Sequence, residues 1–219
     1  MGENMASRSV ATGRARGDPA NSESAQQLVQ AAIDLMRERD TLDVSFVDIA
    51  ERAGHPQGLI GYYFGNKQGL LVAALERSIA RALAQLESLL AADYDPVEKM
   101  RMHLNGIAEA YFRFPFFNRL LQAMVRDGSP EEAARLTQRL IHPMMDAQAT
   151  IIDAGVAQGV FRPVDKKLFY FATVGAADGL NAARFILGSE LGEEIDAEVS
   201  KRNAAAVIDF FLAGLLKQA

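Results

Sequence analysis

The chain of 219 residues has no cysteine, which excludes disulfide bonds, thiol catalysis and cysteine-based metal sites. It has no run of 18 apolar residues for a membrane span and no hydrophobic signal core near its N-terminus, so we expect a cytoplasmic protein with no membrane contact. The Gly-x-Ser-x-Gly elbow, the P-loop, the His-Glu-x-x-His motif and the dinucleotide fingerprint are all missing. We therefore expect no enzyme activity, no catalytic residue and no cofactor.

Histidine is scarce as well. The three histidines, His55, His103 and His142, lie far apart in the sequence. A metal site built from His103, His142 and a carboxylate is one interpretation, but a lone histidine on a helix is more often packed or exposed. We therefore expect no metal ligand.

Positive charge is low for a protein that would bind nucleic acid. The formal net charge is −5, and residues 1–70 carry seven Lys and Arg against nine Asp and Glu, a balance of −2. Phosphate neutralisation supplies most non-specific DNA affinity, so any basic contact has to be local. We expect residues 1–20 to form a disordered basic arm. It is either a tail without function, in part an expression remnant, or an arm whose arginines enter the minor groove.

The sequence does contain helical periodicity almost throughout. Hydrophobic residues make up 49% of the chain, which suffices for a sizeable core, and no strand pattern of useful length occurs. We therefore expect an all-α protein. Besides two short helices within 45–64, helices are expected at 24–39, 67–91, 95–113, 116–127, 130–157 with a kink at Pro143, 165–187 and 193–217.

Residues 45–71 carry the most informative pattern, two short helices joined by a tight turn with a third helix close behind. Ser45 precedes Asp48 by three residues, which is typical of a helix N-cap. Gly54 supplies the backbone freedom that the turn needs. Pro56 suits the first turn of the next helix, because its missing N–H has no partner there.

The second short helix has an unusual outward side. Ile60 and Phe64 point inward together, and the residues left outside are Gln57, Gly58, Gly61 and Tyr62. A side with two glycines packs poorly and solvates poorly, so it indicates a partner that approaches the backbone closely. This is typical of a helix-turn-helix protein that inserts its second helix into the DNA major groove.

The third helix begins beside a cation. Asn66 can cap it, and Lys67 lies in its first turn, where a positive charge opposes the helix dipole by up to about 1 kcal/mol. A phosphate at the same helix N-terminus would offset this unfavourable interaction.

Residues 24–71 resemble the DNA-binding module of the tetracycline-repressor (TetR) family. The matching residues, in spacing without a gap, are Asp48, Ile49, Ala50, Glu51, Arg52, Ala53, Gly54, Gly58, Tyr62, Tyr63, Phe64, Lys67, Leu70 and Leu71. Three positions depart from the family pattern: Val44 replaces the usual Thr, Asp40 replaces the Gly that usually ends the first helix, and Pro56 replaces a frequent Ser. These departures concern individual DNA contacts rather than the module.

Pattern and resemblance together predict a helix-turn-helix DNA-binding domain at 21–70 and a helical effector-binding and dimerisation domain at 71–219. Gln57 is the candidate for base contact, because its amide can read adenine through two hydrogen bonds. Ser45, Tyr62, Tyr63 and Lys67 are candidates for phosphate contact. Gly58 and Gly61 complete the candidate DNA surface.

The second half is rich in aromatic residues and methionine, most of which we expect in the core. Ligand pockets are also largely apolar with a few polar groups. Asp178 and Asn181 share a helical face with Phe185, and they are either a solvated stripe, contacts between subunits or anchors of a ligand. The candidate ligand-binding residues are Phe112, Phe116, Met145, Asp178 and Asn181.

The helices at 165–187 and 193–217 are apolar on wide faces, and Gly175 and Gly179 allow close approach of another helix. One chain has too few elements to cover both faces, so we expect a homodimer through these helices, in which an arginine at Leu212 or Gly175 gives monomers or unfolded protein. The resemblance implies the same, a two-fold dimer with a four-helix interface.

We therefore predict a ligand-responsive transcriptional repressor that binds a palindromic double-stranded DNA operator and is released by a small apolar or aromatic effector. The long helix 67–91 would be the main connection between the domains. Two alternatives stay open: a constitutive DNA-binding protein with a filled core, and a helical interaction protein that no longer binds DNA.

Overall fold

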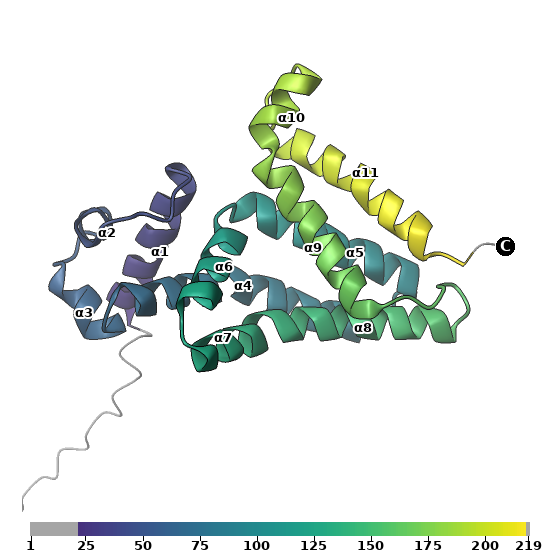
Figure 1. Ribbon diagram of the computed structural model, residues 1–219, viewed down its shortest axis with the longest axis horizontal. Helices are drawn as coiled ribbons and strands as arrows, with labels where there is room; N and C mark the ends of the chain where they lie inside the picture. Colours follow the sequence, from purple (N-terminus) through teal and green to yellow (C-terminus); the bar gives the residue numbers. More distant parts are fainter. Residues whose placement is uncertain (1–21, 218–219) are drawn as a thin grey trace, which may run out of the picture.

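The computed structural model describes residues 22–217, and this part of the chain is built from helices joined by short loops (Figure 1). This confirms the all-α class. The helices are α1 (Glu23–Glu38), α2 (Phe46–Ala53), α3 (Gly58–Phe64), α4 (Lys67–Ala91), α5 (Pro96–Arg113), α6 (Phe117–Asp127), α7 (Pro130–Leu136), the π-helical turn η2 (Thr137–Ile141), α8 (His142–Ala157), α9 (Lys166–Ala182), α10 (Arg184–Leu191) and α11 (Ala197–Leu215). The expected arm at 1–20 lies outside the described residues.

Helices α1 to α3 form the head, and their ends follow from local chemistry. The Ser45 hydroxyl accepts a hydrogen bond from the Asp48 amide at 3.0 Å and starts α2, as expected. Gly54 ends α2 in the left-handed region at φ 68°. Pro56 is not in the first turn of α3, which begins only at Gly58; the proline lies in the preceding turn.

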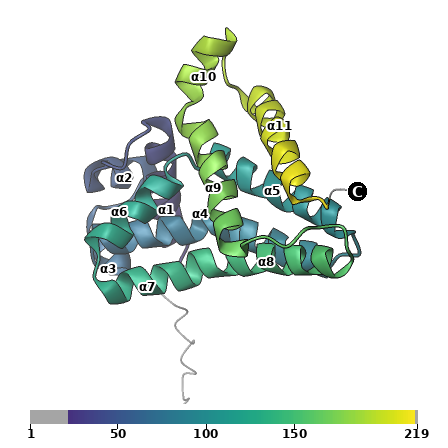
Figure 2. The ribbon, with the colours of Figure 1, turned by 45° about the vertical axis from the view of Figure 1, so that its right-hand side comes forward.

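Helices α4 to α11 form the body. Helix α4 starts at Asn66, whose side chain accepts a hydrogen bond from the Gly69 amide at 2.9 Å. It leaves the head and packs on α5 and α8, while α5 also packs on α9 and α11. Figures 1 and 2 both show α9 and α11 converging toward α10, which projects at the top of the body.

The hydrophobic interior consists of two cores. The first joins the head to α4 and also to α6, α7 and η2, so that Phe116 and Leu120 are buried together with Leu28 and Ile60. The second lies between α5, α8, α9 and α11. The expectation that α4 is the main connection is therefore incomplete, because the start of α6 is a second connection between head and body.

A pair of arginines from the body also binds the head, at Asp40 after α1. Among residues 22–217, Asp40 is the one residue other than glycine that has a positive φ, at 46°. Its carboxylate forms ion pairs with Arg119 of α6 and with Arg184 of α10, the latter at 2.9 Å. Partial burial alone would raise the pKa of Asp40, but the hydrogen bonds from Arg184 and Arg119 outweigh it and hold the pKa below its usual value.

Two expected helices are interrupted. The segment 130–157 divides into α7, η2 and α8, because Pro143 has no N–H for the preceding turn and η2 absorbs the mismatch. The helix expected at 165–187 ends at Ala182. There the Arg184 guanidinium turns back to the Asn181 carbonyl at 3.2 Å while it binds Asp40. Phe185 therefore belongs to α10 and not, as expected, to the helix face of Asp178 and Asn181.

Candidate DNA surface and ligand cavity

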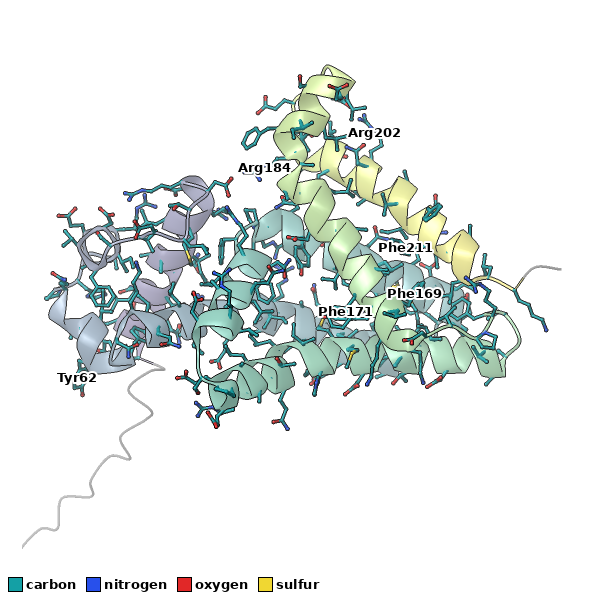
Figure 3. All side chains as sticks on the ribbon, in the orientation of Figure 1. Tyr62, Phe169, Phe171, Arg184, Arg202 and Phe211 are labelled. Atoms are coloured by element: carbon teal, nitrogen blue, oxygen red, sulfur yellow. The ribbon has the colours of Figure 1, made fainter. Side chains whose placement is uncertain are left out.

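The outward side of α3 has the composition that the sequence predicts. Gln57, Gly58, Gly61 and Tyr62 are exposed, and Tyr62, at 70% exposure, lies at the outer end of the head in Figure 3. Neither glycine has a positive φ, and a Cβ added at either would meet no atom within 4 Å. Because glycine within a helix is unfavourable by roughly 0.5–1 kcal/mol, and no contact within residues 22–217 requires these two, the surface suits a partner that comes close to the backbone.

The other candidate DNA residues lie around this surface with different partners. Tyr63 is half-buried, packs on the head core and holds its ring 5.0 Å from that of Tyr62 in an edge-to-face contact. The Ser45 hydroxyl is engaged as the α2 cap. Lys67 places Nζ 3.4 Å from a carboxylate oxygen of Asp43, so an intramolecular partner already offsets its unfavourable position at the start of α4.

Ion pairing in the head extends to all its basic residues. Between residues 22 and 70 the Lys and Arg side chains each bind a carboxylate. The pairs are Arg37 with Asp34, Arg39 with Asp48, Arg52 with Glu38 and Lys67 with Asp43. The hydrogen bond from Arg52 lowers the pKa of Glu38, and that from Arg39 lowers the pKa of Asp48. A phosphate would have to compete with these acids, so the described head offers little unpaired positive charge.

The body contains a partly open cavity of about 50 Å³ between α4, α5, α6, η2, α8 and α9. Its walls are mostly apolar and include Ile79, Phe114, Phe117 and Met144, together with the rings of Tyr111 and Tyr170. Burial raises the pKa of Tyr170 to about 12. The pKa of Tyr111 is also raised, mainly by burial and to a smaller extent by electrostatic interaction with Tyr170 and Asp178. Both phenols are therefore protonated at neutral pH and can donate a hydrogen bond.

A larger cleft of about 770 Å³ opens to solvent between α4 and α5. Arg81, Gln85 and Glu109 lie along it, and His103 and Met144 line it from the interior. Met144 and Ala82 line the smaller cavity too, so the two spaces adjoin each other, and of these two side chains that of Met144 is the flexible one.

The candidate ligand residues lie around the cavity rather than in its wall. Phe112 and Met145 are half-buried, Phe116 is fully buried in the head core, and none of the five lines the cavity or the cleft. The Asp178 carboxylate accepts a hydrogen bond from Asn118 of α6 at 2.6 Å. The Asn181 carbonyl accepts one from Arg184. Their ligand role stays a prediction, and within the described residues these polar groups connect α9 to α6 and α10.

The sequence did not predict a buried polar cluster of His103, Gln148 and Thr173 in the body. Gln148 of α8 is 0% exposed, and its Oε1 lies 3.1 Å from His103 Nε2 and 3.3 Å from Thr173 Oγ1. Its Nε2 has no hydrogen-bond partner, a situation unfavourable by roughly 1–3 kcal/mol. Desolvation, opposed by the hydrogen bond with Gln148, lowers the pKa of His103 to about 4, so the imidazole is neutral. In residues 22–217 no group of acidic or His side chains is arranged to hold a metal ion.

The outer faces of α9, α10 and α11 carry large exposed apolar side chains. These are Leu168, Phe171, Phe185, Ile186, Leu191 and Phe210. Phe169 and Phe211 instead pack edge to face at 5.8 Å and hold α9 against α11 (Figure 3). Leu212 is 2% exposed and belongs to the second core, so of the two outcomes expected for an arginine there the burial favours unfolding; Phe210, at 76% exposure, occupies the outward side.

Comparison with known proteins gives the class of the protein. Residues 28–74 match the family "Bacterial regulatory proteins, tetR family", and residues 93–219 match "Tetracyclin repressor-like, C-terminal domain". The HTH-type transcriptional regulator BetI of Stenotrophomonas maltophilia is 28% identical over 206 residues, which cover 85% of this chain and 92% of that protein.

Solved structures share the fold. PfmR of Thermus thermophilus, a TetR family transcriptional regulator, superposes with a TM-score of 0.68 and 24% identity, covering 85% of this chain and 97% of that one. FadR of Bacillus subtilis, solved with stearoyl-CoA, gives a TM-score of 0.67 and 16% identity over 86% of this chain and 98% of that one. The chain belongs to the TetR family. It is a transcriptional regulator with a ligand-binding C-terminal domain, and not an enzyme. None of the helices in residues 22–217 is long and apolar enough to cross a membrane.

Proposed function

We propose that this protein is a ligand-controlled repressor that binds a palindromic operator as a homodimer and is released by a small, apolar or aromatic effector. The outward side of α3 is the observation that carries the DNA-binding role: Gln57 lies beside two glycines whose presence no contact in the described residues requires. With Gln57 as the base-reading residue, Tyr62, Tyr63, Lys67 and the start of α2 at Ser45 contact the backbone phosphates.

Selection from a random duplex library, followed by fluorescence anisotropy with the selected duplex, tests this role. We expect a palindromic site, and we expect Gln57→Ala to bind it more weakly by roughly 1–3 kcal/mol while accepting other bases at one position. Gln122→Ala, an exposed glutamine on α6, is the matched control. If Gln57→Ala binds the selected site like wild type, Gln57 does not read bases; if no duplex is selected, the protein is the interaction protein of the alternative interpretation.

The exposed apolar side chains of α9 and α11 support a homodimer through these helices. Gly175 and Gly179 are exposed, and a Cβ added to either would meet no atom within 4 Å, which leaves room for a second helix. A two-fold dimer would present two copies of α3 to two half-sites of the operator. Light scattering of the wild-type chain tests the assembly, and a monomer at micromolar concentration would contradict it.

Release of DNA would follow from a change in the angle between body and head. Three consecutive residues of α6 connect the relevant parts: Phe117 lines the cavity, Asn118 binds Asp178 of α9, and Arg119 binds Asp40 of the head. A ligand that displaces Phe117 would therefore move the contact at Asp40 as well. Helix α4, which lines the cavity through Ser78, Ile79 and Ala82, carries the same movement to α3.

The FadR structure with stearoyl-CoA supports an effector with a large apolar part, because it is a neighbour of the same fold. A thermal-shift screen separates this function from constitutive DNA binding, since an effector stabilises the folded protein by mass action. The effector should then weaken operator binding, and a stabilising ligand that leaves operator affinity unchanged would exclude induction.

A further inference from the structure

We propose that the effector is an uncharged, mainly apolar molecule with a carbonyl or similar hydrogen-bond acceptor, which binds in the cavity between α4, α5 and α9 and places its acceptor among the donors of Tyr111, Tyr170 and Gln148. This inference rests on the proposed function and specifies the chemistry of its ligand. It follows from the polar groups that the cavity presents and from the charges that its walls do not have.

The two tyrosines supply the first donors. Their rings line the cavity, and neither hydroxyl has a hydrogen-bond partner among residues 22–217, in contrast to the Ser78 hydroxyl, which donates to the Ala74 carbonyl at 2.7 Å. A protonated phenol that faces an apolar space is best satisfied by an acceptor from outside the protein.

Gln148 supplies a further donor one helical turn away. Met144, which lines the cavity, lies four residues before Gln148 on α8, so both residues are on the same face of that helix. On α5, His103 likewise precedes the cavity residue Ile107 by four positions, and on α9 Thr173 lies between the cavity residues Tyr170 and Val174. The unpartnered Nε2 of Gln148 thus belongs to a buried polar cluster whose members neighbour cavity-lining residues along α5, α8 and α9.

The charges around the cavity argue against an ionic ligand. None of its lining residues is Lys, Arg, Asp or Glu, and His103 is uncharged. A carboxylate ligand would find donors but no cation to balance its charge, and its desolvation would be unfavourable. It would also lie near the carboxylate of Asp178, whose charge affects Tyr111.

The cavity of about 50 Å³ is smaller than the sites that hold drug-sized molecules. Met144 borders both this cavity and the open cleft, so a change of its rotamer joins the two spaces. The polar cluster is then reached from the cleft past Met144, while the apolar part of the ligand remains among Ile79, Phe114 and Phe117.

Four probes of similar size and different charge test the proposal: acetophenone, ethylbenzene, benzoate and benzylammonium. Binding is measured by thermal shift and by titration calorimetry with the full-length protein. We expect acetophenone to bind about three- to tenfold more tightly than ethylbenzene, the effect of one hydrogen bond, and benzoate and benzylammonium to bind more weakly than both.

Tyr170→Phe and Gln148→Leu should each reduce the preference for acetophenone over ethylbenzene, and Tyr94→Phe, at the exposed rim of the cleft, should leave it unchanged. Tyr170→Phe keeps the shape of the side chain, so it remains informative if Gln148→Leu is unstable. Equal binding of acetophenone and ethylbenzene, stronger binding of either ion, or no binding of any probe would each overturn the proposal. DNA binding measured on the same preparations reports separately on the proposed function, because it does not depend on which probe binds.

Discussion

Substitutions at Asp40 can separate the effect of backbone strain on stability from the effect of contacts between head and body. Its φ of 46° is unfavourable for an L-residue by roughly 1–2 kcal/mol, although less so for Asp than for most side chains. Its carboxylate binds Arg119 and Arg184, and the side chains of Asp40 and Arg184 are 37% and 21% exposed. Partly exposed ion pairs contribute roughly 0.2–1 kcal/mol each.

Three variants distinguish these contributions. Asp40→Ala loses both ion pairs and keeps the strain, so we expect the largest decrease in the free energy of unfolding, roughly 1–3 kcal/mol. Asp40→Gly loses the same ion pairs but relieves the strain, so it should lie within about 1 kcal/mol of wild type. Asp40→Asn tolerates the left-handed region and loses the charge, so it should be destabilised by roughly 0.5–2 kcal/mol.

Urea unfolding at pH 7 measures all three differences. A double-mutant cycle of Asp40→Asn with Arg184→Met isolates the ion pair between them. Because the folded pKa of Asp40 is lowered, its stabilising contribution is present above the unfolded pKa and is lost as pH falls through the folded value. The difference between wild type and Asp40→Asn should therefore shrink in acid. If Asp40→Ala is as stable as Asp40→Gly, the strain argument is wrong, and a zero coupling energy in the cycle refutes the contact with Arg184.

Four further outcomes are expected. Gln57→Ala should weaken selected-site binding as described above, while Gln122→Ala should not. Lys67→Ala should lower the slope of log affinity against log salt by about one unit per subunit relative to Lys201→Ala, and an unchanged slope would mean that Lys67 remains with Asp43 on DNA. Phe210→Arg should give folded monomers in light scattering, whereas Val125→Arg, at another exposed position, should remain a dimer. Leu212→Arg should instead unfold the second core. A Phe210→Arg variant that is still a dimer would place the interface elsewhere. The pKa of His103 is about 4 in the folded protein, so as pH falls from about 6.5 the unfolded state binds a proton first. The free energy of unfolding of wild type should therefore fall by up to about 3 kcal/mol relative to that of His103→Asn. Parallel pH profiles of unfolding for the two proteins would disprove this.

The helix-turn-helix could be predicted from the sequence because its signals are local. The caps at Ser45 and Asn66 act within three residues, and the left-handed turn at Gly54 needs a glycine. The caps at Asn66 and Asp95 likewise marked the starts of α4 and α5, and the apolar stripe of α4 indicated its length. In the sequence, Asp40 stands at a position where the TetR family usually has glycine. Its positive φ shows that the backbone keeps a left-handed conformation there although the residue is not glycine.

The interior of the body could not be predicted in the same way, because it depends on which apolar face turns inward. Helix α11 has Phe210, Phe211 and Leu212 in succession, and only packing on α5 and α9 decides that Leu212 is buried while Phe210 is exposed. The contact of His103 with Gln148 joins residues 45 positions apart. The end of α9 depends on Arg184, whose partner Asp40 is 144 residues away.

The ion pairs of the head add to the effect of its negative charge, because they leave little positive charge free to bind phosphate. From the sequence, a balance of −2 over residues 1–70 argued against DNA binding, and in the structure each Lys and Arg of residues 22–70 already has an acidic partner. On the proposed function, the contribution of residues 22–70 to DNA affinity then comes mainly from the close fit of α3 and from hydrogen bonds, which depend less on salt than phosphate neutralisation does. A regulator that bound DNA in this way would be especially sensitive to the angle of its head, because a fit lost by misalignment is not replaced by general attraction to phosphate. A hundredfold loss of operator affinity corresponds to about 2.7 kcal/mol, which is comparable to the two ion pairs at Asp40 counted over both subunits of a dimer. The contacts of α6 and α10 with the head therefore contribute enough energy for the induction that we propose, in which ligand binding weakens DNA binding.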